Sequence, residues 1–250
     1  MKRAGGRVAL VGAGPGAPDL LTLRAVARLR AADVVFYDGL TTRQTLALAP
    51  AAEHISVARR VGRKTLRHDQ VIAMMIEAAR EGRRIVRLKS GDPFVLGRGG
   101  EEARALRAAR VPVEIVPGIT TALAAPALAG IAVTERDVSA ALVIVSGHDA
   151  ASYTPVLGRL EPGTATVVVL MGLAKRSGIR RCLVDAGWSP ATPTAIVIQA
   201  SQTGERVWTG RLGTLGTRVD GVGGPTQPGV IVIGDVVGRR TPPAGRVMGA

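Results

Sequence analysis

Short apolar runs that alternate with helical patterns are the feature that most constrains the fold of this chain. In the first half, five such runs lead into loops, most of them rich in Gly, Pro or Asp: 8–12, 34–37, 55–57, 85–88 and 113–116. Helical patterns lie between them. Parallel neighbours in a sheet need a crossover connection, usually a helix, so this alternation predicts a parallel sheet.

The second half of the chain has a different character. One helix is expected there, at 178–186. The strands expected around it are 141–145, 166–170, 194–198, 206–208 and 230–233. We therefore predict an α/β protein made of two α/β domains, with a mostly parallel N-terminal sheet, a mixed C-terminal sheet and a cofactor cleft between the domains. The predicted limits are 1–118 for the N-terminal domain, 119–238 for the C-terminal domain and 239–250 for a disordered tail.

Residues 85–102 are the most informative stretch, because a strand pattern there runs into a long loop and then into a helical pattern. Gly91 and Gly97 can adopt backbone angles that are closed to other residues. Ligands of open α/β sheets bind beyond the carboxyl ends of the strands, where this loop is expected. Asp92 and Arg98 add charged groups, so we predict a ligand site here rather than a plain connection.

The loop that follows the first apolar run matches the dinucleotide-binding fingerprint G-x-G-x-x-G/A over residues 12–17. Asp38 follows the next strand, where the ribose-binding acid of that fingerprint is expected. A pyrophosphate cradle needs free backbone N–H donors, which Pro15 and Pro18 lack, and Asp19 would place negative charge beside the phosphate. A dinucleotide-dependent oxidoreductase is therefore the weaker alternative, and a ligand other than a pyrophosphate is favoured.

The formal net charge is +14, from 33 basic and 19 acidic residues, which permits nucleic acid, an anionic membrane surface or a polyanionic small molecule as a partner. Aromatic residues make up only 2% of the chain, too few for a base-stacking platform. Arginines recur from residue 59 to residue 110 among the loops, which suits a carboxylate-rich ligand in a cleft. We expect neither a nucleic acid nor a membrane partner, and a non-enzymatic binder of an anion is a third alternative.

Several kinds of chemistry lack their usual signatures. The three histidines are far apart in sequence, with no Cys or second His at metal-ligand spacing, so no metal site is expected. Neither G-x-S-x-G nor G-x-x-x-x-G-K-[ST] occurs, which argues against hydrolysis and phosphoryl transfer. The single cysteine, Cys182, excludes an internal disulfide, and no apolar run approaches a bilayer span, so we expect a cytoplasmic protein. The loops at the strand ends carry Gly, Pro, Thr, one Asp and several Arg, which supply little acid or base power. Such a site suits a reaction in which the alignment of an activated cosubstrate provides most of the catalysis.

Three loops resemble those of the tetrapyrrole methylases: 11–22, 86–102 and 116–120. The likeness continues through 134–137, 146–148, 171–173 and 229–237, and so covers nearly the whole chain. The run 97–102 is similar to that of the members that act on uroporphyrinogen III. The resemblance implies S-adenosyl-L-methionine as the cosubstrate, methylation of uroporphyrinogen III at carbons 2 and 7 to give precorrin-2 for sirohaem- or cobalamin-type cofactors, and a homodimer. A sister methylase acting on a later corrin intermediate is the nearest alternative.

The resemblance also implies roles for individual residues. Asp38 falls on a proposed proton acceptor, and Arg98 on a proposed substrate-binding or base position. Arg59 stands where the family usually has Lys; an arginine does not readily exchange a proton, so we expect Arg59 to bind a substrate carboxylate. The residues that would line the cofactor are Pro15, Ser90, Gly91, Asp92, Val95, Thr120, Thr121, Met171 and Ala200. Ser90 and Ala200 stand where a Gly is usual or frequent.

Overall fold

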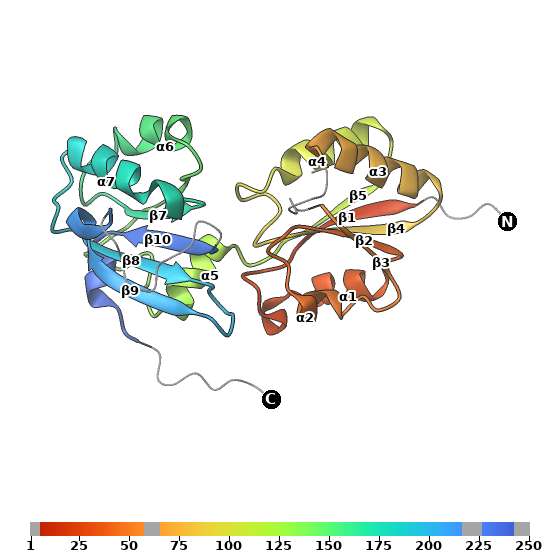
Figure 1. The fold of residues 1–250 in the computed structure, drawn as a ribbon, viewed down its shortest axis with the longest axis horizontal. Coiled ribbons are helices and arrows are strands. Elements are labelled where there is room, and N and C mark those ends of the chain that lie inside the picture. The colour runs from red at the N-terminus through yellow and green to blue at the C-terminus, as the bar shows by residue number, and fades with distance from the viewer. Residues whose placement is uncertain (1–5, 58–65, 217–226, 243–250) are drawn as a thin grey trace. The chain divides into compact units, whose positions relative to one another are not determined.

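The computed structural model describes residues 6–57, 66–216 and 227–242 (Figure 1). The chain divides into two compact units, Met1–Thr121 and Ala122–Ala250. The predicted domain limits at 118 and 238 stay a prediction. Across the described ranges, no helix is both long enough and apolar enough to cross a bilayer.

The described part of the first unit contains a five-stranded sheet in the order β3-β2-β4-β1-β5, with every pair parallel. Its strands are β1 (Arg7–Gly12), β2 (Val34–Tyr37), β3 (Glu53–Ser56), β4 (Arg84–Lys89) and β5 (Val113–Val116). The helices between them are α1 (Leu23–Arg30), α2 (Arg43–Leu46), α3 (His68–Arg80) and α4 (Gly99–Ala108). The predicted parallel sheet is confirmed.

Helices cover both faces of this sheet, as the apolar residues of its strands require. In β1, Val8 and Leu10 pack in one cluster with residues of α3 and α4. Ala9 and Val11 point the opposite way and pack with residues of α1. Figure 1 shows α3 and α4 on one side of the strands and α1 and α2 on the other.

Strand β4 departs from an all-apolar pattern although it lies between β2 and β1 in the sheet. Arg87 and Lys89 are buried, and by strand alternation they share a face with Ile85. Ile85 belongs to the apolar cluster that includes residues of α3 and α4. Two charged side chains are thus enclosed between the sheet and these two helices.

The described part of the second unit contains a mixed five-stranded sheet in the order β6-β7-β10-β8-β9. Its strands are β6 (Leu142–Ser146), β7 (Thr166–Leu170), β8 (Pro193–Ile198), β9 (Arg206–Arg211) and β10 (Gly229–Ile233). Only β6 and β7 are parallel neighbours, and the other pairs are antiparallel. The helices α5 (Thr121–Leu128), α6 (Ala150–Leu157) and α7 (Arg176–Asp185) complete the unit. The predicted mixed sheet is confirmed.

The sequence predicted one helix among the strands of this half, and that helix is α7. The structure contains a second one, α6, which corrects the prediction. The carboxylate of Asp149 caps α6 by accepting a hydrogen bond from the Ser152 backbone N–H, at 2.8 Å. The helix is only eight residues long and contains Pro155, so it has almost no helical periodicity. It supplies the crossover that the parallel pair β6 and β7 needs.

Helix α3 begins at His68 with Arg67 as its N-cap, and Asp69 in its first turn pairs with Arg67. The first residues of the predicted tail form hydrogen bonds with residues 129 and 130. Arg240 Nε donates to the Ala129 carbonyl oxygen at 2.7 Å, and a backbone hydrogen bond joins residue 241 to residue 130.

Candidate functional site

Three loops of the first unit meet at the carboxyl ends of β1, β4 and β5. The backbones of Gly14 and Gly91 exchange two hydrogen bonds, at 3.2 and 2.8 Å, which join the β1 loop to the β4 loop. The Asp92 carboxylate joins the β4 loop to the β5 loop by accepting a hydrogen bond from the Gly118 N–H at 3.1 Å. Parallel strands end at one edge of a sheet, so residues from three distant segments converge there.

Glycines make this meeting of loops possible. A Cβ atom on Gly118 would lie 2.3 Å from the Gly91 carbonyl oxygen and 2.7 Å from the Gly12 Cα atom. A Cβ atom on Gly12 would in turn lie 2.5 Å from Gly118. Gly91 also has a φ of +67°, in the left-handed region that favours glycine. The three backbones therefore approach one another more closely than any side chain would allow.

Asp92 has a structural use that the sequence did not reveal. Its Oδ1 accepts a hydrogen bond from the Phe94 N–H at 2.8 Å, which stabilises its own loop, while Oδ2 holds Gly118. Each carboxylate oxygen can accept a further bond. Asp92 can therefore shape the site and contact a ligand at the same time.

Ser90, Thr120 and Thr121 lie around the same junction. The Ser90 hydroxyl is buried and has no hydrogen-bond partner in the described structure. A Cβ atom placed on Gly91 would lie 3.5 Å from the Thr121 hydroxyl, and its next neighbour is the Thr120 Cα atom at 3.6 Å. A buried hydroxyl without a partner is costly unless a ligand satisfies it, so Ser90 fits a polar cofactor group.

The other predicted cofactor residues of the first unit are in adjacent loops. Pro15 follows Gly14 directly and is half-buried, and Val95 is half-buried between two exposed apolar residues, Phe94 and Leu96. The structure thus brings together, at one sheet edge, those cofactor residues predicted in the first unit: Pro15, Ser90, Gly91, Asp92, Val95, Thr120 and Thr121.

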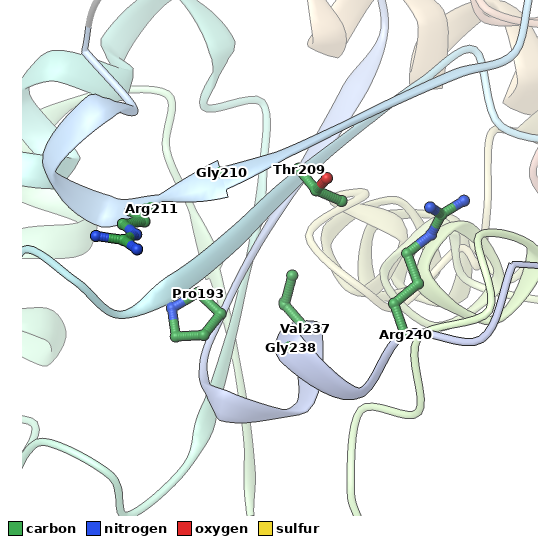
Figure 2. A pocket seen from close by; sticks show the side chains of 7 residues that line it. All are labelled: Pro193, Thr209, Gly210, Arg211, Val237, Gly238 and Arg240. Atoms are coloured by element: carbon green, nitrogen blue, oxygen red, sulfur yellow. The ribbon is translucent and has the colours of Figure 1, made fainter.

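Met171 and Ala200 belong to the second unit. Met171 follows β7, is 52% exposed and has a φ of +58°. Ala200 follows β8 and is buried, and it lies between Gln199 and Ser201, which both have positive φ. Both predicted residues therefore lie in sharply bent segments just after strands. A pocket of about 420 Å³ in this unit, lined by Pro193, Thr209 and Arg240 among others, includes neither of them (Figure 2).

Asp38 is paired with a buried arginine. It follows β2, and its Oδ1 accepts a hydrogen bond from Arg87 Nη2 at 2.5 Å. Arg87 Nε donates to Glu102 Oε1 at 3.1 Å, and Lys89 Nζ donates to the same oxygen at 3.0 Å. The side chains of Arg87, Lys89 and Glu102 are 5%, 4% and 0% exposed, whereas that of Asp38 is 33% exposed. The cluster thus extends from the interior to a carboxylate that solvent can reach.

His68 lies beside this cluster, with Nδ1 at 3.8 Å from Glu102 and Nε2 at 3.8 Å from Glu101. Burial lowers its pKa, and the nearby positive charge of Arg98 lowers it further. Burial likewise lowers the pKa of Lys89, with the Arg87 charge adding to the effect. Among the described residues, no group of His, Cys, Asp and Glu side chains is arranged to hold a metal ion.

Sequence reasoning missed Arg87, Lys89 and Glu102 as a cluster. The available signal was a pair of charged residues at alternate positions of an otherwise apolar strand. Such a pair must find a partner on the covering helix, because an unpaired buried charge is strongly unfavourable. Glu102 in the first turn of α4 is that partner.

Arg98 has an unusual backbone and an acidic partner. It is the N-cap of α4 with a φ of 58°, and its side chain is 57% exposed. Arg98 Nη2 donates to Glu101 Oε2 at 2.7 Å, and this hydrogen bond raises the pKa of Arg98. A raised pKa suits anion binding better than a base role. Arg59 lies outside the described residues.

The dinucleotide alternative lacks its expected geometry. In that fingerprint the glycine loop leads directly into a helix whose N-terminus binds the pyrophosphate. Here a short 3₁₀ turn, Pro18–Leu20, follows the loop, and α1 begins only at Leu23. Thr22 Oγ1 caps α1 by accepting a hydrogen bond from the Ala25 N–H at 3.1 Å. The glycine loop therefore does not open into a helix N-terminus.

The model of the tetrapyrrole (corrin/porphyrin) methylase family matches residues 7–216. The chain belongs to the tetrapyrrole methylases. The resemblance seen in the loops is thereby confirmed over most of the chain.

Relatives of this tetrapyrrole methylase include a uroporphyrinogen-III C-methyltransferase of Methanocaldococcus jannaschii. It is 40% identical over 235 residues, which are 93% of this chain and 97% of the relative. The siroheme synthase of Ectopseudomonas mendocina is 43% identical over 95% of this chain, but the chain spans only 52% of that longer relative. Among solved structures, the uroporphyrin-III C-methyl transferase of Thermus thermophilus, complexed with S-adenosylhomocysteine, matches with a TM-score of 0.78. Its sequence is 37% identical, over 93% of this chain and 99% of that one.

Proposed function

We propose that this tetrapyrrole methylase transfers methyl groups from S-adenosyl-L-methionine to carbons 2 and 7 of uroporphyrinogen III, giving precorrin-2. The observation that carries the proposal is the similarity to a uroporphyrinogen-III C-methyltransferase over 97% of that relative's length. The matching siroheme synthases are about twice as long, so only the part of their activity that this chain spans is inferred here.

The β1, β4 and β5 loops would form the seat of the cosubstrate in the first unit. When bound there, S-adenosyl-L-methionine supplies an electrophilic methyl group on a sulfonium sulfur. The close approach of Gly12, Gly91 and Gly118 brings backbone groups of the three loops together without intervening side chains. Ser90 offers a buried hydroxyl that lacks a partner, and Asp92 offers its remaining lone pairs. Met171 and Ala200 stay predicted cofactor residues of the second unit.

Asp38 is proposed as the proton acceptor. A ring carbon that gains a methyl group leaves a positive charge on the tetrapyrrole, and this charge is removed when the ring loses a proton. The Asp38 Oδ1 is held by Arg87, while Oδ2 makes no hydrogen bond to the described residues and the side chain is one-third exposed. Oδ2 can therefore take up that proton.

Arginines are proposed to bind the carboxylates of the substrate. Arg98 can reach an anion from its exposed position, provided that it leaves or shares Glu101. Arg59 is the second candidate from the sequence. The net charge of +14 supports attraction of a polycarboxylate. A homodimer is proposed on the family resemblance, and a cytoplasmic location on the single cysteine, which suits a reducing compartment.

The decisive experiment is an anaerobic incubation with S-adenosylmethionine and enzymatically generated uroporphyrinogen III, followed by mass spectrometry of the products. A product with two added methyl groups is expected. Asp38→Asn should lose turnover, and Asp33→Asn is the matched control, because Asp33 precedes β2 as Asp38 follows it. Calorimetry with S-adenosylhomocysteine tests the cosubstrate separately.

Three results would contradict the proposal in different ways. Binding of S-adenosylhomocysteine without methylation of uroporphyrinogen III would favour a sister enzyme that acts on a later corrin intermediate. Binding of NAD in place of S-adenosylhomocysteine would favour the oxidoreductase alternative. Affinity for anions that falls steeply with salt, with no cosubstrate binding, would favour a non-enzymatic anion binder.

A further inference from the structure

The Arg87 guanidinium is fixed through all three of its nitrogen atoms. Nε donates to Glu102 Oε1 at 3.1 Å, Nη1 donates to the Leu88 carbonyl oxygen at 3.2 Å, and Nη2 donates to Asp38 Oδ1 at 2.5 Å. The group is 5% exposed, so it has little room to move. A planar guanidinium held in this way defines both the position and the orientation of the carboxylate that it binds.

Glu102 is the anchor of this arrangement. Its Oε1 accepts hydrogen bonds from Arg87 and Lys89, whereas its buried Oε2 has no hydrogen-bond partner. Burying several charges is seldom the most stable choice, since apolar residues of similar volume often do as well. Stability alone is therefore a weak explanation for the cluster.

A second ion pair on the same two strands shows what a structural pair looks like. Strand β2 is preceded by Asp33 and followed by Asp38, and each aspartate pairs with an arginine of β4. Arg84 binds Asp33 at the amino end of β2, through side-chain distances of 2.6 and 3.0 Å, with both side chains well exposed. Arg87 binds Asp38 at the carboxyl end of β2, beside the ligand loops, and also donates a hydrogen bond to Glu102. Within the described structure, Arg84 has no second acidic partner of this kind besides Asp33.

We infer that Arg87, held by Glu102, is a positioning residue that orients the Asp38 carboxylate for proton uptake during methyl transfer. This inference rests on the proposed function. The Arg87 side chain is only 5% exposed, which leaves it little surface for a substrate, so it would act through Asp38. Because Arg87 uses only Oδ1, it leaves Oδ2 available to accept a proton.

The test compares Arg87→Lys, Asp38→Asn, the double variant and the control Arg84→Lys. A lysine keeps the positive charge but cannot bridge Glu102 and Asp38 in one plane. Arg87→Lys is expected to lower kcat by about 100-fold, as a small misplacement of a reacting group does. The KM for S-adenosylmethionine and the affinity for S-adenosylhomocysteine should be unchanged, and Arg84→Lys should turn over like the wild type.

A double-mutant cycle separates positioning from a general structural role. If Arg87 acts through Asp38, the double variant should be no slower than Asp38→Asn alone, and a crystal structure of Arg87→Lys should show a displaced Asp38 carboxylate. Additive losses of kcat, or an unmoved carboxylate with full kcat, would overturn the inference. Equal losses of kcat and of S-adenosylhomocysteine affinity would also overturn it.

Glu102→Gln carries the test if Arg87→Lys fails to fold. It keeps an oxygen acceptor for Arg87 but removes the charge, and it should lower kcat without changing S-adenosylhomocysteine affinity. Unchanged kcat in a folded Glu102→Gln protein would refute the anchoring role. The wild-type protein separates the two hypotheses. If the wild type does not methylate uroporphyrinogen III, both the proposed function and the inference fail. If the wild type methylates it and Arg87→Lys is equally active, only the inference fails.

Discussion

Gly118→Ala is the substitution that tests the architecture of the ligand loops most directly. The added Cβ would lie 2.3 Å from the Gly91 carbonyl oxygen, 2.7 Å from the Gly12 Cα atom and 2.8 Å from the Gly12 carbonyl carbon. All three are backbone atoms, held by hydrogen bonds between the β1 and β4 loops. No flexible side chain can move aside, so the loops themselves must separate.

The expected loss of stability has two parts. Overpacking against fixed atoms costs about 1–3 kcal/mol. Separation of the loops also breaks the hydrogen bond from the Gly118 N–H to the Asp92 carboxylate, which contributes about 1.5–3 kcal/mol because the acceptor is charged. Together these give a loss of about 2.5–6 kcal/mol, a large part of the stability of a typical domain.

Urea unfolding followed by far-ultraviolet circular dichroism is the appropriate assay. Both tryptophans, Trp188 and Trp208, belong to the second unit, so their fluorescence would not report directly on the loops of the first. Gly100→Ala is the matched control. A Cβ atom on Gly100 would meet only Arg104 Nη1, at 3.6 Å, and helix propensity in α4 should raise stability by up to about 1 kcal/mol.

The reasoning would be refuted if Gly118→Ala lost less than about 0.5 kcal/mol, the range of an ordinary surface substitution. It would also be refuted if Gly118→Ala kept full affinity for S-adenosylhomocysteine, since the same loops are proposed to form the cosubstrate seat. A loss of affinity in Gly100→Ala would show that the two positions are not the contrast that the structure indicates.

Three further predictions concern single side chains. Arg84 lowers the pKa of Asp33 from 3.8 to about 2, chiefly through its side-chain hydrogen bond, so the pair stabilises the folded state above pH about 4 and is lost as the pH falls toward about 2. Asp33→Asn should therefore lose about 1 kcal/mol of stability in urea unfolding at neutral pH, allowing for solvent screening. The difference in stability from the wild type should vanish near pH 2. A difference that does not change with pH would contradict this account. Ser90→Ala should leave unfolding unchanged or slightly raise stability, because the hydroxyl has no partner, yet weaken S-adenosylhomocysteine binding about tenfold by calorimetry; equal affinity would exclude a contact there. Thr22→Ala should lose about 1 kcal/mol in the same unfolding assay through the uncapped α1 N-terminus, whereas Thr22→Ser should not.

The parallel sheet and its ligand edge could be predicted because their causes are local. The signals for them span only a few residues each: apolar runs of strand length, the glycines and prolines that follow these runs, and the helical spacing between them. Helix α6 was not predicted, because its eight residues with an internal proline have little helical periodicity. The Asp149 cap was the one sequence signal for it. The family was also readable from the loops, and its model matches residues 7–216.

The contacts that define the candidate site are of another kind. Asp38 and Arg87 are 49 residues apart in the chain, and Arg87 and Glu102 are 15 apart, so no local pattern pairs them. The sequence suggested a ligand contact for Asp92 but not its bond to Gly118, and it suggested a base or anion role for Arg98 but not its bond to Glu101.

The sequence by itself determined which segments become strands, that those of the first half run parallel, and which loops collect at their carboxyl ends. Only the tertiary structure decided which charged groups are partners and which remain open to a ligand. The physical reason is range: backbone preference and burial act over a few residues, whereas ion pairs and hydrogen bonds depend on which distant atoms the packed sheet and helices bring within about 3 Å of each other.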